Sequence, residues 1–234
     1  MRKVLEFLSD LAQNNNREWF TANKQRYQEA LLVFTQFAAE YLDGMKRIDP
    51  TLADVNVKDC LWRIYRDTRF SKDKTPYKDH FGAYPAAPQP GKPNSAGKHS
   101  DRAGYYLHIQ PGQCMFAAGM WCPNGDLLNA VRREMVANYE EVEDIMAADA
   151  FQRYFRDFDQ TYMLKRVPNG YDPNFVHPDW LKQKWFIIST PFTDDEVCAP
   201  DFLGRLLTVA EAAKPMNDFL NYTFEEYGEF PDRR

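Results

Sequence analysis

Hydrophobic residues recur every three to four positions in several long stretches of the chain, and this spacing predicts amphipathic helices. The first stretch begins at Val4, and the second follows the run Asn14-Asn15-Asn16, which offers favoured N-cap residues. A third helix is expected to be capped by Asp126. The last is expected to be capped by Asp201 and kinked at Pro215. The predicted long helices cover residues 4–11, about 20–45, 126–146 and 201–222, and shorter ones cover 149–158 and 178–182.

Shorter stretches are rich in aromatic and β-branched residues and predict strands. Two of them, 104–109 and 114–121, flank the turn sequence Gln110-Pro111-Gly112-Gln113, which predicts a β-hairpin with a type II or slightly longer turn. Further strands are expected at 60–66, 81–84, 162–167 and 184–190. Because helices and strands are partly segregated, the pattern predicts an α+β fold: a single domain over residues 1–234, with a mainly antiparallel sheet packed against several helices.

Composition adds a core of ordinary size, since 44% of the residues are hydrophobic and 15% are aromatic. The formal net charge of −5 argues weakly against a general binder of nucleic acids or membrane surfaces. No apolar run reaches the roughly 18 residues of a membrane span, and the first residues do not resemble a signal peptide. We therefore expect a cytoplasmic protein without a membrane partner. The four cysteines form no C-x-x-C pair and show no zinc spacing, so neither a metal nor a cofactor is expected.

Residues 85–102 are rich in proline and glycine and carry no evident apolar anchor, so we expect a long flexible loop. One interpretation is a plain excursion or a disordered segment. The other is a lid that would bring Lys92, Lys98, His99 and Arg102 over the residues that precede it.

A basic segment, residues 63–80, precedes this loop. It holds six Arg or Lys residues and three Asp residues, so it carries a net charge of +3 in an acidic chain. Guanidinium groups offer a planar fork for carboxylate or phosphate, and ammonium groups offer a point charge. The candidate ligand-binding residues are Arg63, Arg66, Arg69, Lys72, Lys74, Tyr77 and Lys78, together with Lys165 and Arg166 of a second basic turn. Alternatively, each aspartate pairs with a basic neighbour and the segment is an ordinary solvated surface.

His80 and His108 are the candidate catalytic residues, because imidazole titrates near neutral pH and suits general acid–base work. His108 alternates with Tyr106 along a predicted strand, so both side chains should project to one face. The alternative is that each histidine is a hydrogen-bonded structural residue. The chain has no H-E-x-x-H, G-x-S-x-G, Walker-type or G-x-G-x-x-G sequence.

The sequence is compatible with three functions, and it does not decide whether the protein is an enzyme. The first is binding of, or catalysis on, a small anionic and possibly phosphorylated ligand. The second is a module associated with nucleic acid that uses Tyr65, Tyr77 and Tyr105 as stacking platforms; the acidic total makes it less expected without excluding it. The third is a non-enzymatic interaction protein that docks through the basic segment. The sequence gives no oligomeric state.

Residues 66–78, Arg-Asp-Thr-Arg-Phe-Ser-Lys-Asp-Lys-Thr-Pro-Tyr-Lys, resemble the signature of a widespread bacterial family of conserved hypothetical proteins, described as a domain of unknown function. Three other segments resemble the same family: 15–20 with Asn23 and Tyr27, 104–109, and 164–168 with residues 170–172. They keep their order over most of the chain. The resemblance implies one full-length domain, and it implies no reaction, ligand or catalytic residue.

Overall fold

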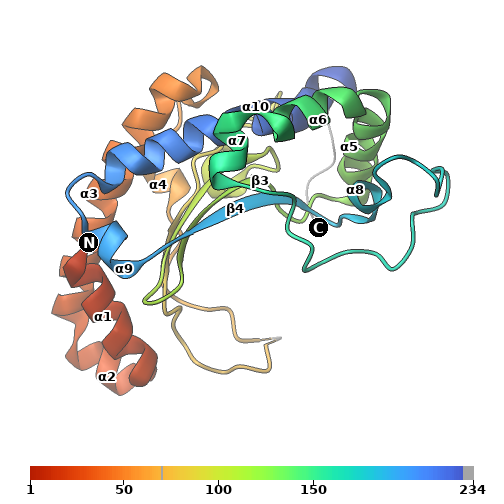
Figure 1. Ribbon diagram of the computed structural model, residues 1–234. Coiled ribbons are helices and arrows are strands. Elements are labelled where there is room, and N and C mark those ends of the chain that lie inside the picture. Colours follow the sequence, from red (N-terminus) through yellow and green to blue (C-terminus); the bar gives the residue numbers. More distant parts are fainter. Residues whose placement is uncertain (70, 229–234) are drawn as a thin grey trace.

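Four strands form one antiparallel sheet in the order β1-β2-β3-β4 in a computed structural model of the chain, which describes residues 1–69 and 71–228 (Figure 1). The strands are β1 Phe81–Ala83, β2 Gly104–Ile109, β3 Cys114–Met120 and β4 Phe186–Phe192. β2 and β3 are the predicted hairpin, and Gly112 follows Pro111 with a φ of 72°, as the second central residue of a type II turn requires. The α+β prediction is confirmed.

Strand residues alternate between the two faces of the sheet, and one face builds the core. Tyr105, Leu107 and Ile109 of β2 are fully buried on this closed face, as are Phe116 of β3 and Phe186 of β4. The helices α10 and α7 lie on this side of the sheet in Figure 1. Among the described residues no helix layer covers the opposite face, and the candidate histidines lie on this open face.

The helices match the predicted spacing in most places. In chain order they are α1 Arg2–Gln13, α2 Arg17–Ala22, α3 Lys24–Ile48, α4 Val57–Cys60, α5 Gly125–Ala137, α6 Tyr139–Ala147, α7 Asp149–Tyr154, α8 Pro178–Lys182, α9 Asp194–Cys198 and α10 Phe202–Glu226. Short 3₁₀ turns, η1 Pro50–Leu52, η2 Pro93–Ser95 and η3 Gly97–His99, lie between them. None of the described helices combines the length and the apolar character needed to cross a membrane.

Two predicted helices are each divided at an asparagine. Asn23 separates α2 from α3, and Asn138 separates α5 from α6. Asparagine forms local hydrogen bonds to the backbone and so competes with the helical ladder. The cap predicted at Asp126 is also wrong, because Asn124 accepts the hydrogen bond from the Leu127 amide. Pro215 does lie inside α10, while the side chain of Asp201 makes no cap hydrogen bond.

The strand predicted at 60–66 is wrong in its regular form. Cys60 ends helix α4, and beyond it only single backbone bridges form, from Leu61 to Ala83 and from Tyr65 to Tyr77. The segment still lies beside β1 as an irregular edge. The strand predicted at 162–167 is wrong too, because the strand-like pairing of this stretch is limited to one isolated bridge, Met163 to Gln183.

Residues 85–102 have apolar anchors, contrary to prediction. Ala86, Ala87 and Ala96 are buried, and the hydroxyl of Ser100 donates to the carbonyl of Ala87. A Cβ added at Gly97 would lie 2.4 Å from the Asp59 carbonyl oxygen, so the segment packs closely on α4. These contacts tie the segment to the core and argue against a free flap. Its role as a lid stays a prediction.

Helix α10 is joined to the beginning of β2 by side-chain amides. Asn221 accepts from the amide of Ala103 at 2.8 Å and donates to the carbonyl of the same residue at 3.1 Å. Asn217 donates to the carbonyl of Gly104 at 3.0 Å. Both asparagines are buried, so these bonds satisfy backbone groups that water cannot reach.

Candidate functional site

The open face of the sheet is partly exposed and carries the rings and imidazoles of β1, β2 and the adjoining edge. Tyr106 and His108 project from β2, and Trp62 from the irregular edge packs edge-on against Tyr106 at 5.4 Å between centroids. A Cβ added at Gly82 would lie 2.8 Å from the Tyr106 ring and 3.2 Å from Trp62. The missing side chain at Gly82 therefore lets these two rings lie directly on the sheet.

A continuous polar network runs across this face. His108 Nδ1 lies 2.7 Å from the Tyr106 hydroxyl, and His108 Nε2 lies 2.8 Å from Gln110 Oε1. Gln110 Nε2 donates to Asp79 Oδ2 at 3.1 Å, and Asp79 Oδ1 lies 3.3 Å from His80 Nδ1. The two imidazole centroids are 4.5 Å apart. The structure thus brings together both candidate histidines, which lie 28 positions apart in sequence.

Burial sets the protonation of this network. It lowers the pKa of His80 to about 4, with a further lowering from the neighbouring His108. Burial also lowers the pKa of His108 and raises that of Tyr106. At neutral pH both imidazoles are therefore uncharged and the Tyr106 hydroxyl keeps its proton.

In part of the basic segment, aspartates pair with neighbouring basic residues, as the alternative interpretation expected. Arg66 forms an ion pair with Asp73, and the two groups also share Thr75. Arg69 binds Asp67 through Nε and Nη2. The hydrogen bonds from Arg69 lower the pKa of Asp67 to about 2, and those from the Thr75 amide and Arg66 lower the pKa of Asp73 to about 2. Lys74 donates to the carbonyl of Thr68. Arg69 and Lys74 are therefore engaged within their own loop.

Lys78 differs from the other cations of the segment. It is half-buried, and within the described part of the chain no carboxylate forms an ion pair with it. Burial lowers the pKa of Lys78, and the charges of Arg63 and Arg66 lower it further. Lys78 in turn lowers the pKa of His80. The charges of Arg63 and Arg66 therefore act on Lys78, and the charge of Lys78 acts on His80, while Lys72 is an exposed cation of the same segment.

The predicted stacking platforms are mostly buried, which corrects that expectation. The Tyr77 ring is 5% exposed and stacks on Phe20 at 3.9 Å, so it cannot stack on a ligand. Tyr105 is fully buried and donates its hydroxyl to Asp49. Of the three tyrosines, Tyr65 alone is exposed.

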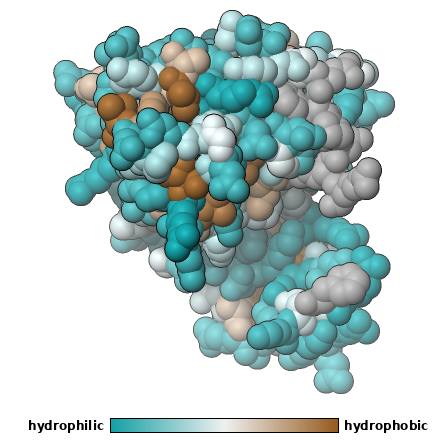
Figure 2. Space-filling model, turned by 90° about the vertical axis from the view of Figure 1, so that its right-hand side faces the viewer, coloured by the Kyte–Doolittle hydropathy of each residue, from teal (hydrophilic) through white to brown (hydrophobic). Residues whose placement is uncertain are grey.

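The second basic turn does not meet the first. Lys165 and Arg166 are exposed and lie near the β4 edge of the sheet, where the amide of Leu164 donates to the carbonyl of Lys182. The basic segment adjoins β1, at the opposite edge of the sheet. The two segments are drawn well apart in Figure 1. The side of the molecule that carries α5 and α8 is mostly hydrophilic, with hydrophobic residues confined to a limited area (Figure 2).

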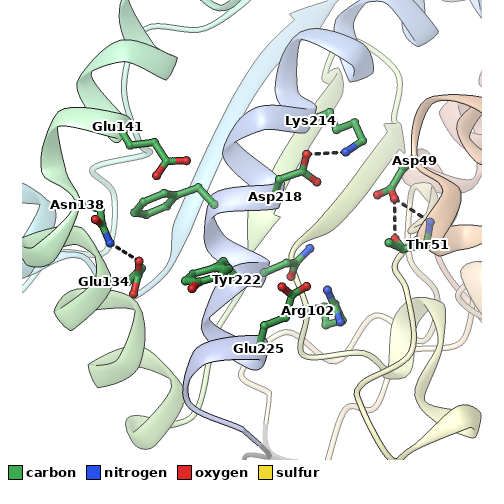
Figure 3. Close-up of a pocket in the computed structure, with 12 residues that line it drawn as sticks. Asp49, Thr51, Arg102, Glu134, Asn138, Glu141, Lys214, Asp218, Tyr222 and Glu225 are labelled. Carbon is green, nitrogen blue, oxygen red and sulfur yellow. Dashed lines mark hydrogen bonds and ion pairs between the residues drawn. The ribbon is translucent and has the colours of Figure 1, made fainter.

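A separate cavity of about 610 Å³ lies beside α10 on the helical side and contains none of the predicted site residues (Figure 3). Its buried carboxylates serve the fold. Asp49 accepts from Thr51 and Tyr105, and Glu134 accepts from Asn138 and Tyr227. Among residues 1–69 and 71–228, no group of three His, Cys, Asp or Glu side chains is placed to hold a metal ion.

Sequence reasoning missed Asp79, Gln110 and Trp62 as members of the site. Asp79 was expected only to neutralise its basic neighbours, and Gln110 only to belong to the hairpin turn. One signal was present: residues 78, 80 and 82 alternate toward β1 as 106 and 108 do along β2. Pairing of β1 with β2 then brings His80 toward His108, since Gly82 faces His108 in the register.

Comparison with known proteins places the chain in a family. No curated protein and no solved structure matches it. The family model described as Conserved hypothetical protein (DUF2461) matches residues 3–219, which include both basic turns, the histidine pair and most of α10. The chain therefore belongs to the DUF2461 family of conserved hypothetical proteins.

Proposed function

We propose that the protein binds a small anionic ligand, such as a phosphorylated metabolite, beside Lys78 on the open face of the sheet. The placement of the Lys78 ammonium carries the proposal, because this cation is half-buried and lies near two other cations without an ion-paired carboxylate among the described residues. Burying a charge without a counter-charge is unfavourable. A bound anion would supply that counter-charge and relieve the repulsion from Arg63 and Arg66.

The ligand set is smaller than the sequence suggested. Lys78 and Arg63 hold the anion, Arg66 lies near them in its ion pair with Asp73, and His80 and His108 lie beside the anion. Arg69, Lys74 and Tyr77 support the loop through their own contacts. Lys165 and Arg166 stay apart because they belong to the opposite edge of the sheet.

Thermal unfolding with inorganic pyrophosphate as the probe tests this proposal, because a ligand selective for the folded state raises Tm. We expect pyrophosphate to raise the Tm of the protein and of Lys72→Met, and to leave the Tm of Lys78→Met unchanged. Both variants remove one positive charge from the same segment, so the comparison separates a local site from general electrostatics. Equal loss of the shift in both variants, or no shift in the unmodified protein, would contradict the proposal.

The alternatives give different results in the same experiments. A nucleic-acid module would bind single-stranded oligonucleotide with an affinity that falls steeply with salt. The burial of Tyr77 and Tyr105 weighs against it, since two of its three stacking rings are inside the protein. A docking surface for another protein would respond to neither pyrophosphate nor oligonucleotide.

A further inference from the structure

The direction of each hydrogen bond on the open face can be worked out from Asp79. Its carboxylate can only accept, so the Gln110 group 3.1 Å away is the donating NH₂. The Gln110 carbonyl oxygen therefore faces His108 Nε2 at 2.8 Å, and it requires a proton on that nitrogen. His108 is thus held in the tautomer that is protonated at Nε2.

The second nitrogen of His108 is engaged as well. A neutral imidazole carries one N–H, so Nδ1 of His108 is an acceptor for the Tyr106 hydroxyl at 2.7 Å. Burial raises the pKa of Tyr106, which keeps this hydroxyl protonated as a donor. Both ring nitrogens of His108 are therefore occupied within the protein.

His80 is held in the opposite tautomer. Its Nδ1 faces Asp79 Oδ1 at 3.3 Å, and since the carboxylate accepts, Nδ1 carries the proton. Nε2 of His80 is then an unprotonated nitrogen with a free lone pair, and no hydrogen bond joins it to another of the described residues. The side chain is 28% exposed, so the nitrogen belongs to a ring that solvent can reach.

From these donor and acceptor directions we infer that His80, through Nε2, is the proton acceptor of the anion site, and that Asp79 is its positioning residue. The inference rests on the proposed function, because the anion beside Lys78 is what would bring a hydroxyl group or a water molecule to His80. In the step itself, the proton of that O–H passes to Nε2, and the bonding electron pair stays on the oxygen. The ligand class is thus an anion that carries, or is attacked by, an activated hydroxyl.

The charges that surround His80 explain how ligand binding and basicity are coupled. Lys78 and Asp79 face it from its own segment, and His108, with Tyr106 and Gln110 behind it, faces it from β2. In the free protein, burial and the neighbouring His108 and Lys78 disfavour the imidazolium. A bound anion offsets the charge of Lys78 and favours the protonated form. Binding of the anion should therefore raise the pKa of His80 and make it a stronger base while the ligand is present.

Two measurements test the tautomers without knowledge of the reaction. Long-range ¹H–¹⁵N spectra should show His80 protonated at Nδ1 and His108 protonated at Nε2. Diethyl pyrocarbonate acylates unprotonated imidazole nitrogens, so at pH 6 it should modify His80 at least about tenfold faster than His108. A spectrum with His80 protonated at Nε2, or equal modification of the two histidines, would overturn the inference.

Asp79→Asn tests the positioning role, with Asp73→Asn as the matched control that removes a charge from the same segment. An asparagine cannot accept from both Gln110 and His80 as the carboxylate does. We expect Asp79→Asn to shift His80 toward the Nε2-protonated tautomer and to slow its modification, while Asp73→Asn leaves both unchanged. Unchanged tautomers in Asp79→Asn would overturn the role of Asp79.

Pyrophosphate separates the two proposals. It should protect His80 from modification in the unmodified protein and in Lys72→Met, and fail to protect it in Lys78→Met. A reactive, correctly protonated His80 that pyrophosphate does not protect would overturn the anion site while leaving the tautomer assignment in place. Protection of a His80 that is protonated at Nε2 would support the anion site and overturn the assignment of the base.

Discussion

Tyr105 and Tyr106 are adjacent in β2 and have opposite surroundings. Tyr105 is fully buried on the closed face, where its hydroxyl donates to the buried carboxylate of Asp49 at 3.0 Å. Tyr106 lies on the open face, where its hydroxyl meets His108 at 2.7 Å. Burial raises the pKa of both. The Tyr105 contact joins the sheet to the end of α3, whereas the Tyr106 contact joins groups that can exchange protons.

The comparison teaches that one strand can serve stability and chemistry at once, because successive side chains point to opposite faces. The closed face is packed against helices, so changes there should act mainly on the free energy of unfolding. Within residues 1–69 and 71–228 no helix covers the open face, so changes there should act mainly on ligand binding and protonation.

The largest difference is expected between Phe116→Ala and Met115→Ala. Phe116 is fully buried on the closed face, and its truncation should lower the free energy of unfolding by about 3–5 kcal/mol. Met115 is partly exposed on the open face, so its truncation should lower it by less than about 1.5 kcal/mol. Urea denaturation measures both. Equal losses would mean that the two faces are packed alike.

The second largest effect is expected in the pH dependence of the free energy of unfolding, to which His80 contributes. Its folded pKa of about 4 lies below the ordinary value of 6.5, so the unfolded chain takes up a proton first as the pH falls. Stability contributed by neutral His80 is present above pH 6.5 and declines between pH 6.5 and 4, by an amount on the order of 2–3 kcal/mol. His80→Asn should flatten this decline relative to the unmodified protein. Parallel pH profiles for the two proteins would contradict the depressed pKa.

Removing one hydroxyl from each tyrosine gives a smaller contrast. Tyr105→Phe leaves the buried Asp49 oxygen without its donor and should lower the free energy of unfolding by about 1–3 kcal/mol. Tyr106→Phe should lower it by about 1 kcal/mol or less, because its partner His108 is only partly buried. The ¹⁵N spectrum of His108 should change in Tyr106→Phe and stay unchanged in Tyr105→Phe. A greater loss of stability in Tyr106→Phe would reverse the comparison.

The smallest effect is expected at the tip of the basic segment. Asp67 and Arg69 form a solvent-exposed ion pair, and such pairs contribute little to stability in physiological salt. Asp67→Asn should therefore leave Tm unchanged within error at neutral pH, although the pKa of Asp67 is lowered to about 2. A fall in Tm comparable to that of Tyr105→Phe would show that this loop supports the core.

The sequence predicted the elements that depend on local pattern. The hairpin of β2 and β3 follows from alternation around Pro111 and Gly112. The division of helices at Asn23 and Asn138 was missed, because apolar periodicity continues through both positions. Periodicity records which face is buried, and it does not record whether the backbone ladder is interrupted.

The site was predicted in part, for a related reason. Residue types identified Lys78, His80 and His108 as chemically capable, and alternation placed Tyr106 with His108. The bond between Asp79 and Gln110, which orients the Gln110 amide toward His108, spans 31 positions and depends on how β1 pairs with β2. The pairing of Arg66 and Arg69 with neighbouring aspartates depends on loop geometry that charge counting cannot supply.

The amides of Asn217 and Asn221 have a consequence for the order in which the chain can be completed. Ala103 receives both of its partners from Asn221, which lies 118 positions later, on the last helix. During synthesis on the ribosome, the backbone groups at the start of β2 therefore stay bonded to water until α10 has emerged and can replace it. The last helix therefore supplies hydrogen-bond partners to the sheet as well as covering it. A chain that stops before residue 217 should lack the partners of Ala103 and Gly104 at the beginning of β2.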